Sequence, residues 1–303
     1  MVALDPSSSA LLGVADRDEL RVWAVPTTGA TPDFSVPSKG PLIVVDFAAP
    51  ERVMAVTATG NFFEWNWATG AITLNHKLYS GGVAGYSSDG RYLAVGGELW
   101  DRKEQRDLAT LRVHEQTALQ FSADGSRLLT AGRHPFELTV REPHSGRIFQ
   151  ERFSQDIRTA ALNARGDRIA VALLSGIVRI LRVPDFHIVS EFWSRPDPVA
   201  LRFLDDEHVV TAVESCVEVH AVATAWRTFR GPVSGQITSF ASSAHLAVVG
   251  TREGKVWIWD LAKGETLASA QVASSAIDAI ALNPKTRRAA AGDETGAITV
   301  VGW

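Results

Sequence analysis

Residues 250–264 read GTREGKVWIWDLAKG, a complete β-hairpin signal. One apolar segment ends at Gly250, and a glycine-containing turn leads into a second, which ends in Trp259-Asp260. Another turn is expected at Lys263-Gly264, because glycine readily adopts the positive φ angles of tight turns. The fold depends on whether this hairpin is isolated or is one copy of a repeated unit.

The pattern of an apolar strand end, a turn and a second apolar run recurs eight times along the chain. Its anchor residues are Leu4, Phe47, Tyr86, Phe121, Leu162, Phe203, Phe240 and Leu282. Neighbouring anchors are separated by 35 to 43 residues. A nearly constant period of about 40 residues is typical of a repeat architecture.

Each unit contains four short β signals, which we label strands a to d. In the fifth unit they are residues 157–162, 168–174, 177–183 and 187–193. Glycine, proline, aspartate, asparagine and serine cluster between the runs, as expected of turns. Runs b and c are apolar at consecutive positions, which indicates strands covered on both faces. One four-stranded meander cannot cover itself on both faces, so the units must stack and close into a ring.

These segments resemble the WD-repeat β-propeller family. The resemblance is carried by VWIWD (256–260) with LAKGE (261–265), by FSADG (121–125) and YSSDG (86–90), and by LWD (99–101). It covers all 303 residues as a period. The family's hydrogen-bonded tetrad requires a Gly-His pair before strand a, and no unit contains one there. His114 comes nearest, but it lies about two residues too close to Phe121. We therefore expect a degenerate member, stabilised by apolar packing more than by polar tetrads.

The predicted fold class is all-β: a propeller of eight four-stranded antiparallel blades, with seven as the alternative. Eight is favoured because residues 4–23 and 282–301 align without a gap, and both contain strands b and c. The chain is expected to form one domain, residues 1–303. The expected blades are approximately 1–41, 42–81, 82–115, 116–156, 157–197, 198–235, 236–275 and 276–303.

The last blade is expected to lack its outer strand in this chain, because Trp303 ends strand c. In the family that the sequence resembles, an N-terminal segment usually supplies this strand. We therefore expect the chain to be the C-terminal part of a longer protein; the alternative is a three-stranded last blade whose strand c is an unpaired edge that could accept another chain.

Composition argues against several classes of partner. The net charge of -4 arises from 34 acidic and 30 basic residues without a basic run, so no nucleic-acid partner is expected. No apolar run approaches the roughly 18 residues of a membrane helix, so no membrane partner is expected. Cys216 is the only cysteine, which excludes an internal disulfide, and the N-terminus lacks a signal-peptide pattern. The 24 arginines against 6 lysines are typical of a GC-rich bacterial genome, and we expect a cytoplasmic protein.

The sequence indicates no catalytic, cofactor or metal site. Phosphate-loop, HExxH, GxSxG and EF-hand patterns are missing, and the eight histidines hold non-equivalent positions in the units. Residues 62–67, FFEWNW, fit blade packing, with an aromatic cage for a ligand as the alternative. A propeller enzyme, lactonase- or hydrolase-like, stays open as the alternative function; it would need converging acids or metal ligands at the mouth of the central channel.

The expected function is a non-catalytic protein-protein interaction or sensor scaffold, within a larger bacterial signalling, defence or regulatory protein. The resemblance implies that the b–c and d–a loops gather on one rim and hold a protein or peptide, and an upstream domain of the same polypeptide is a further candidate partner. The partner-binding candidates are Arg17, Arg133, His134, Trp193, Arg195, Arg252 and Glu253. Each has the reach or aromatic surface to anchor a partner.

Overall fold

The computed structural model describes the chain except residues 1, 5–9, 14–18, 25–33, 38–41, 50–51, 58, 67–68, 78–83, 96, 112–113, 135, 195–197 and 244. The described residues form β-strands joined by turns. All strand pairs are antiparallel, and each sheet follows the order of its strands along the chain. In the described part of the chain we find no helix able to cross a membrane. The chain divides into two compact units, Met1–Gly81 with Val233–Trp303, and Gly82–Pro232.

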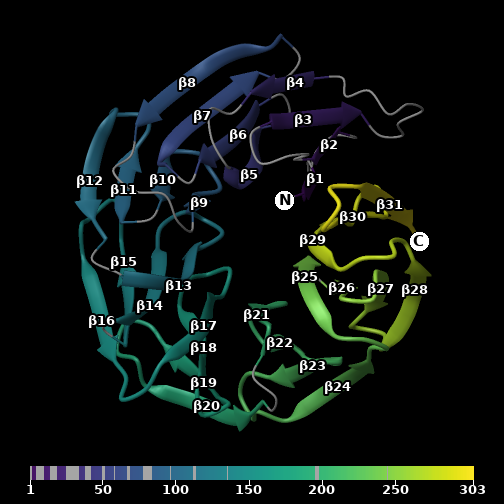
Figure 1. Ribbon diagram of the computed structural model, residues 1–303. Coiled ribbons are helices and arrows are strands. Elements are labelled where there is room, and N and C mark those ends of the chain that lie inside the picture. Colours follow the sequence, from purple (N-terminus) through teal and green to yellow (C-terminus); the bar gives the residue numbers. More distant parts are fainter. Residues whose placement is uncertain are drawn as a thin grey trace. The chain divides into compact units, whose positions relative to one another are not determined.

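The unit of residues 82–232 contains four four-stranded blades, the third to the sixth of the chain (Figure 1). The third and fourth are β9 (Ala84–Tyr86), β10 (Tyr92–Val95), β11 (Glu98–Asp101), β12 (Arg106–Thr110) and β13 (His114–Phe121), β14 (Leu128–His134), β15 (Glu137–Arg141), β16 (Ile148–Arg152). The fifth and sixth are β17 (Ile157–Leu162), β18 (Arg168–Leu173), β19 (Ile177–Arg182), β20 (Ile188–Trp193) and β21 (Ala200–Phe203), β22 (His208–Val213), β23 (Cys216–Ala221), β24 (Arg227–Pro232). Their first strands lie beside one another, β9 by β13, β13 by β17 and β17 by β21.

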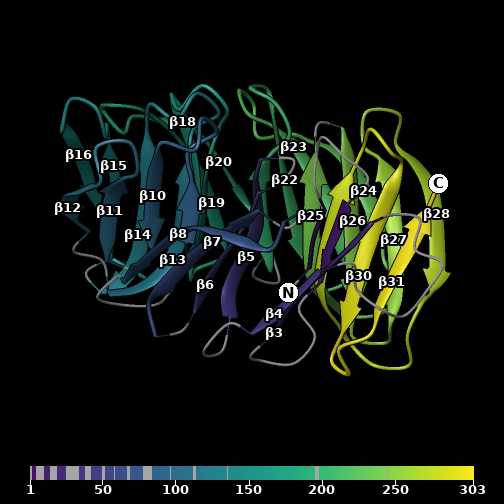
Figure 2. The same cartoon turned by 90° about the horizontal axis from the view of Figure 1, so that it is seen from above.

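The other unit contains the first, second, seventh and last sheets. Their strands are β1 (Val2–Leu4), β2 (Ala10–Gly13), β3 (Glu19–Ala24), β4 (Phe34–Pro37); β5 (Leu42–Ala49), β6 (Arg52–Thr57), β7 (Asn61–Asn66), β8 (Ala71–Lys77); β25 (Ile237–Ser243), β26 (Leu246–Thr251), β27 (Lys255–Asp260), β28 (Glu265–Gln271); and β29 (Ile277–Asn283), β30 (Arg288–Asp293), β31 (Ile298–Gly302). Strand β29 lies against β25 and against β1, and β1 lies against β5 (Figure 1). Figure 2 shows the strands of the seventh sheet beside β30 and β31 of the last sheet. The first and last repeats are therefore direct neighbours.

The number of complete blades differs from the preferred expectation. The described residues form seven four-stranded sheets, the number given as the alternative, and not eight. The remaining sheet, β29-β30-β31, has three strands, which fits the expected lack of an outer strand in the last repeat. The sequence favoured eight blades because residues 282–301 align with residues 4–23 over strands b and c. That alignment does not reveal whether the last repeat has a strand d. The all-β, antiparallel, blade-like architecture is confirmed.

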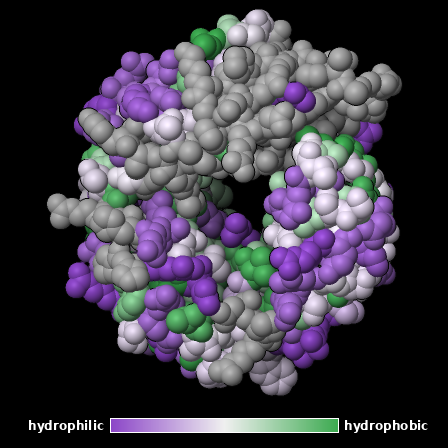
Figure 3. Space-filling view, in the orientation of Figure 1, coloured by the Kyte–Doolittle hydropathy of each residue, from purple (hydrophilic) through white to green (hydrophobic). Residues whose placement is uncertain are grey.

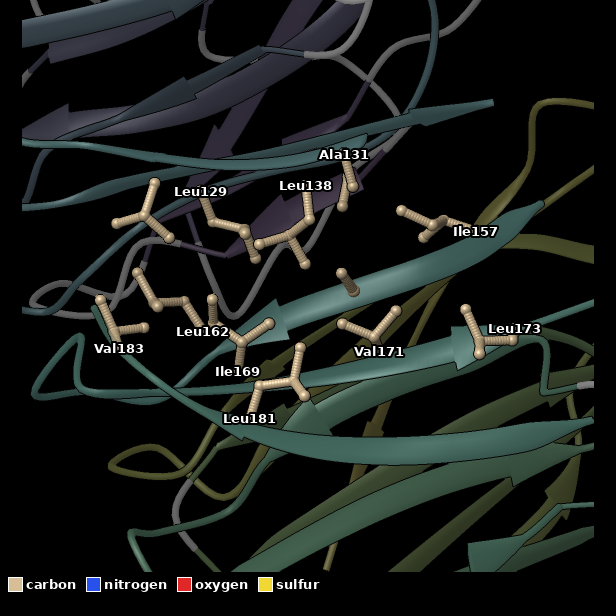
Figure 4. Close-up of a cluster of buried hydrophobic side chains, with 13 residues drawn as sticks. Leu129, Ala131, Leu138, Ile157, Leu162, Ile169, Val171, Leu173, Leu181 and Val183 are labelled. Atoms are coloured by element: carbon tan, nitrogen blue, oxygen red, sulfur yellow. The ribbon is translucent and has the colours of Figure 1, made fainter. Parts of the chain in front are cut away.

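The apolar runs of the fifth blade are strands covered on both faces, as predicted. On one face, Ile169, Val171 and Leu181 pack against side chains of the fourth blade, including Leu129 and Leu138 (Figure 4). On the other face, alternate residues of the same strands pack against the sixth blade. They are Ala170, Ala172, Val178 and Ile180. Full burial of each Leu, Ile or Val stabilises the fold by about 1.5–3 kcal/mol relative to exposure, so the interfaces between blades are a major source of stability.

Polar contacts join the a–b turns of the fourth, fifth and sixth blades. The amide of Asn163 donates to Asp167 in its own turn and to Asp206 in the next blade, both at 2.8 Å. In the opposite direction, Arg127 of the fourth blade donates to the Gly166 carbonyl at 2.7 Å. Asn163 is fully enclosed, and a buried amide left without partners would be costly. These bonds therefore hold three consecutive blades in register at the a–b end.

The two Trp-Asp pairs that suggested the family occupy equivalent places. Trp100 and Trp259 are buried, and Asp101 and Asp260 each accept two backbone N–H bonds from the turn that follows strand c. Asp101 also binds the guanidinium of Arg91 at 2.9 Å. Burial opposes ionisation of Asp101, but the Arg91 hydrogen bond and the turn N–H groups lower its pKa below the usual value. The aspartate of each pair thus caps a c–d turn.

The aromatic residues of β7 form part of the core, in agreement with the packing interpretation. Phe62, Phe63 and Trp65 are buried, and the rings of Phe63 and Trp65 stack 5.2 Å apart. Trp67 lies outside the described residues. The indole N–H groups of Trp65 and Trp257 have no hydrogen-bond partner among the described residues. These two strand-c tryptophans therefore act through apolar packing rather than through a hydrogen-bonded tetrad.

Candidate interaction rim

The meander places strand ends in a regular way. In each blade strands a and c run in one direction and b and d in the other, so the b–c turn, the end of d and the start of a share one end of the sheet. In each of the two compact units, we call this end of its blades the b–c rim. The a–b and c–d turns lie at the opposite end.

The predicted partner-binding residues are spread over both units. Trp193 ends β20, Arg133 and His134 end β14, and Arg252 and Glu253 form the turn between β26 and β27. Arg17 and Arg195 lie outside the described residues. Residues 132–134 belong to strand β14, in which His134 pairs with His114 of β13.

Arg133 is less accessible than the sequence indicated. Its side chain is partly buried, and its Nε is enclosed without a hydrogen-bond partner among the described residues. A guanidinium in this position has less freedom to reach a partner than one on an exposed loop.

The turn formed by Arg252 and Glu253 is exposed and held in place by the preceding loop. The Arg252 N–H donates to the Gln236 carbonyl at 2.8 Å, and the Gln236 N–H donates to the Glu253 carboxylate at 3.1 Å. The amide of Gln271 also donates to the Glu253 carbonyl. The turn is therefore tied to a d–a loop and to β28, and the Glu253 carboxylate is held against that loop, whereas Arg252 extends from a fixed backbone.

Three exposed large apolar side chains lie at the b–c rim of the unit of residues 82–232, where the fifth blade meets the sixth. Trp193 ends strand d of the fifth blade and is 59% exposed, Leu174 follows its strand b and is 46% exposed, and Val199 precedes strand a of the sixth blade and is 49% exposed. We call these three residues the blade-5 patch. Leu174 and Val199 were missed in the sequence, where each reads as the last or first residue of a neighbouring strand. Exposed apolar side chains of this size mark contact surfaces more often when they gather than when they stand alone.

The backbone beneath the blade-5 patch is well connected. The Leu174 N–H donates to the Asp156 carbonyl at 2.9 Å, and the Ser194 N–H donates to the Gly176 carbonyl at 2.8 Å. Val199 donates its N–H to the Ala212 carbonyl at 2.7 Å. The backbone of these three positions is therefore fixed by hydrogen bonds to neighbouring strands and turns.

A second exposed aromatic side chain lies at the opposite end of the same unit. Trp226, in the c–d turn between β23 and β24, is 78% exposed. Nearby groups form an internal ion pair instead of a reactive site: Arg227 binds the buried Glu218 at 2.8 Å. The sequence did not single out Trp226, because a turn position does not reveal how far a side chain projects.

His220 and Cys216, two side chains capable of acid–base or nucleophilic chemistry, are enclosed in the sixth blade. His220 stacks on Phe192 with ring centroids 3.8 Å apart, and burial lowers its pKa. Cys216 is buried. Within the part of the chain that the structure describes, no three His, Cys, Asp or Glu residues are grouped so that they could hold a metal ion. On the face shown in Figure 3, hydrophobic residues form small separate groups between larger hydrophilic areas.

Structural comparison identifies the fold. The chain is similar to the computationally designed Ika8 protein, with a TM-score of 0.81 and 19% identity over 100% of this chain and 96% of that one. It is similar to the C-terminal WD40 domain of Sif2 (TM-score 0.84, 14% identity, 100% and 95% covered) and to Saccharomyces cerevisiae Sqt1 (TM-score 0.83, 10% identity, 100% and 95% covered). No protein-family model matches the sequence, and no curated protein matches it. The fold is a β-propeller, as in the WD40 domain of Sif2.

Proposed function

We propose that this chain is a non-catalytic interaction module that binds a protein or peptide at its b–c rim, with Trp193 as the main anchor. The exposed blade-5 patch on a hydrogen-bonded loop framework carries this proposal. Tryptophan is among the residues most enriched at interface hot spots, because a large rigid surface is buried at little entropic cost. The WD40 fold of the structural neighbours supports the same class of function.

The charged candidates are proposed as secondary contacts at the b–c rim of the unit to which each belongs. Arg133, His134 and Arg195 belong to the unit that carries Trp193, and Arg17, Arg252 and Glu253 belong to the other unit. Charged groups at the margin of an interface contribute orientation more than affinity.

The biological setting is part of the proposal. We infer a cytoplasmic module of a larger bacterial signalling, defence or regulatory protein, with an effector domain upstream. The arginine-rich composition and the single buried cysteine support the setting, and the assignment to a larger protein rests on analogy with other propellers.

The magnitude of the Trp193 contribution follows from its exposure. A tryptophan carries about 250 Å² of surface, so burying a 59% exposed side chain removes roughly 150 Å² from water. At about 25 cal/mol per Å² this amounts to about 4 kcal/mol as an upper limit, and hot-spot truncations typically cost 2–4 kcal/mol. Trp193→Ala should therefore weaken partner binding by a factor of at least about 30.

Site-specific photo-crosslinking provides the test. A photoreactive phenylalanine analogue is placed at position 193 or, as the matched control, at position 226 in the c–d turn. Crosslinked partners are identified in cells and purified, and affinity is measured for wild type, Trp193→Ala and Trp226→Ala. We expect crosslinks and an affinity loss at position 193 with little change at position 226. Equal losses, or a partner captured only from position 226, would refute the rim assignment.

A further inference from the structure

A polar cavity of about 250 Å³ lies between the third and fourth blades. It is lined by Thr110, Leu111, Thr130, Glu137, Thr139, Arg141, Ile148 and Gln150. Six of its eight lining residues carry polar or charged side chains, whereas the interface between the fourth and fifth blades is packed with apolar side chains.

The alternation of β15 explains the polarity. Leu138 and Val140 point into the apolar interface with the fifth blade, so residues 137, 139 and 141 share the opposite face, toward the third blade. Thr139 pairs with Thr130 on one side and with Gln150 on the other, which forms a polar row across three strands. The lining thus comes from regular secondary structure, and its positions are well defined.

The two charged residues of the cavity differ in their partners. Glu137 accepts hydrogen bonds from Gln150 at 3.1 Å and Thr139 at 3.3 Å, and it pairs with Arg152 at 3.1 Å. Arg141 has neither an ion pair nor a side-chain hydrogen bond within the described residues, and its Nε is enclosed. Burial lowers the pKa of Arg141. A partly buried guanidinium without an acceptor is destabilising, so it is usually matched by an anion.

We propose that this cavity binds a small monocarboxylic acid, whose carboxylate is held by the Arg141 guanidinium. The planar fork of arginine matches a carboxylate through two parallel hydrogen bonds. The threonine hydroxyls and the Gln150 amide are placed to bind a hydroxyl or carbonyl group of the acid, while Leu111 and Ile148 offer apolar contact for a short carbon chain.

Size and charge restrict the ligand. Cavities for drug-sized ligands usually measure about 300–1,000 Å³, so this one suits a molecule of only a few carbon atoms. Glu137 lies four residues from Arg141 along β15, roughly 13 Å at about 3.3 Å per residue. A second negative charge on the ligand would extend toward this carboxylate. A monoanion is therefore favoured over phosphate or a dicarboxylate.

The test uses 3-hydroxybutyrate as the probe, with its neutral amide and inorganic phosphate for comparison, all at constant ionic strength. Binding is measured by calorimetry and by the thermal midpoint. Arg141→Met removes the guanidinium, and Arg141→Lys keeps the charge without the fork. Arg147→Gln is the matched control, because Arg147 is an exposed arginine of the same blade that does not line the cavity.

We expect saturable binding of 3-hydroxybutyrate to the wild-type chain and none of its amide. Arg141→Met should abolish binding while leaving the unliganded thermal midpoint equal or higher, since the variant removes a partly enclosed guanidinium whose Nε has no hydrogen-bond partner among the described residues. Arg141→Lys should weaken binding at least tenfold, and Arg147→Gln less than twofold. Trp193→Ala should leave this binding unchanged, which separates the cavity from the rim.

Any of three results would overturn the assignment. The first is an equal shift of the thermal midpoint by 3-hydroxybutyrate in wild type and in Arg141→Met. The second is tighter binding of phosphate than of 3-hydroxybutyrate, and the third is no saturable binding of 3-hydroxybutyrate to the wild-type chain.

Discussion

Gly254, in the hairpin turn between β26 and β27, allows a sharp test of the packing between loops. Its φ angle is +79°, and a Cβ placed on it would lie 2.1 Å from the Ala273 carbonyl oxygen and 2.8 Å from that of Ser275. Gly296 occupies the corresponding turn between β30 and β31 with a φ of +85°, and a Cβ there would meet nothing within 4 Å. The two glycines share the backbone conformation but differ in their surroundings.

The cost of an alanine at each position can be estimated from these contacts. A left-handed conformation costs a non-glycine residue about 1–2 kcal/mol, which applies to both Gly254→Ala and Gly296→Ala. At position 254 the neighbouring backbone must also move. That movement disrupts the bonds from the Val272 and Ala273 N–H groups to the Gly254 carbonyl, at 2.9 and 3.1 Å, each contributing about 0.5–1.5 kcal/mol. The totals are about 1–2 kcal/mol at 296 and about 2–5 kcal/mol at 254.

Urea unfolding, followed by tryptophan fluorescence, measures the difference. We expect both variants to unfold at lower urea concentration than wild type, with the larger shift for Gly254→Ala by the equivalent of about 1–3 kcal/mol. Equal shifts would contradict the reasoning, because they would mean that the close approach of residues 273–275 does not constrain this turn.

Three further outcomes are expected. Trp259→Ala should destabilise the fold by about 3–5 kcal/mol because a buried ring is removed, whereas Trp226→Ala should change the free energy of unfolding by less than about 0.5 kcal/mol; chemical denaturation compares the two. Burial lowers the pKa of His220, so below about pH 6.5 the unfolded state binds more protons than the folded state. The free energy of unfolding should therefore fall as the pH drops from 7.5 to 5.5. His220→Gln should reduce this dependence of the free energy of unfolding on pH. The pKa of Asp101 is also lowered, so the stability from its pairing with Arg91 should be present above about pH 4 and lost below it. In acid titrations of unfolding, Asp101→Asn should lose less stability between neutral and low pH than wild type. An equal loss of stability in the two proteins would contradict the pairing.

Much of the fold was predictable because it depends on local pattern. The four apolar runs of the fifth unit correspond to β17–β20 to within one residue at each end, since strand runs and turn residues alternate there without ambiguity. Strand β13 begins at His114, two residues before the expected start of the fourth blade. Its early residues are polar, and they join the strand through backbone pairing that hydrophobic pattern does not report.

The sites were less predictable, because exposure and pairing depend on neighbouring blades. Arg133 was singled out for its reach, but the extended pairing of β14 makes it a partly buried strand residue. Arg141 reads as an ordinary polar position at a strand end. Only the packing of the third blade shows that its guanidinium lies at a cavity without an acceptor. Trp193 was singled out as an aromatic residue at the start of a d–a loop, whereas Leu174 and Val199 gave no such signal.

The contact between β1 and β29 has a consequence for synthesis on the ribosome. Val2 and Ile277 begin strands that lie side by side, although 275 residues separate them in the chain. At about 5–20 residues per second, the first strand waits roughly 14–55 s after its own translation before its neighbour exists. During that time the nascent N-terminal sheet has an unprotected flank, and chaperone binding to it should be strongest before residue 277 is made.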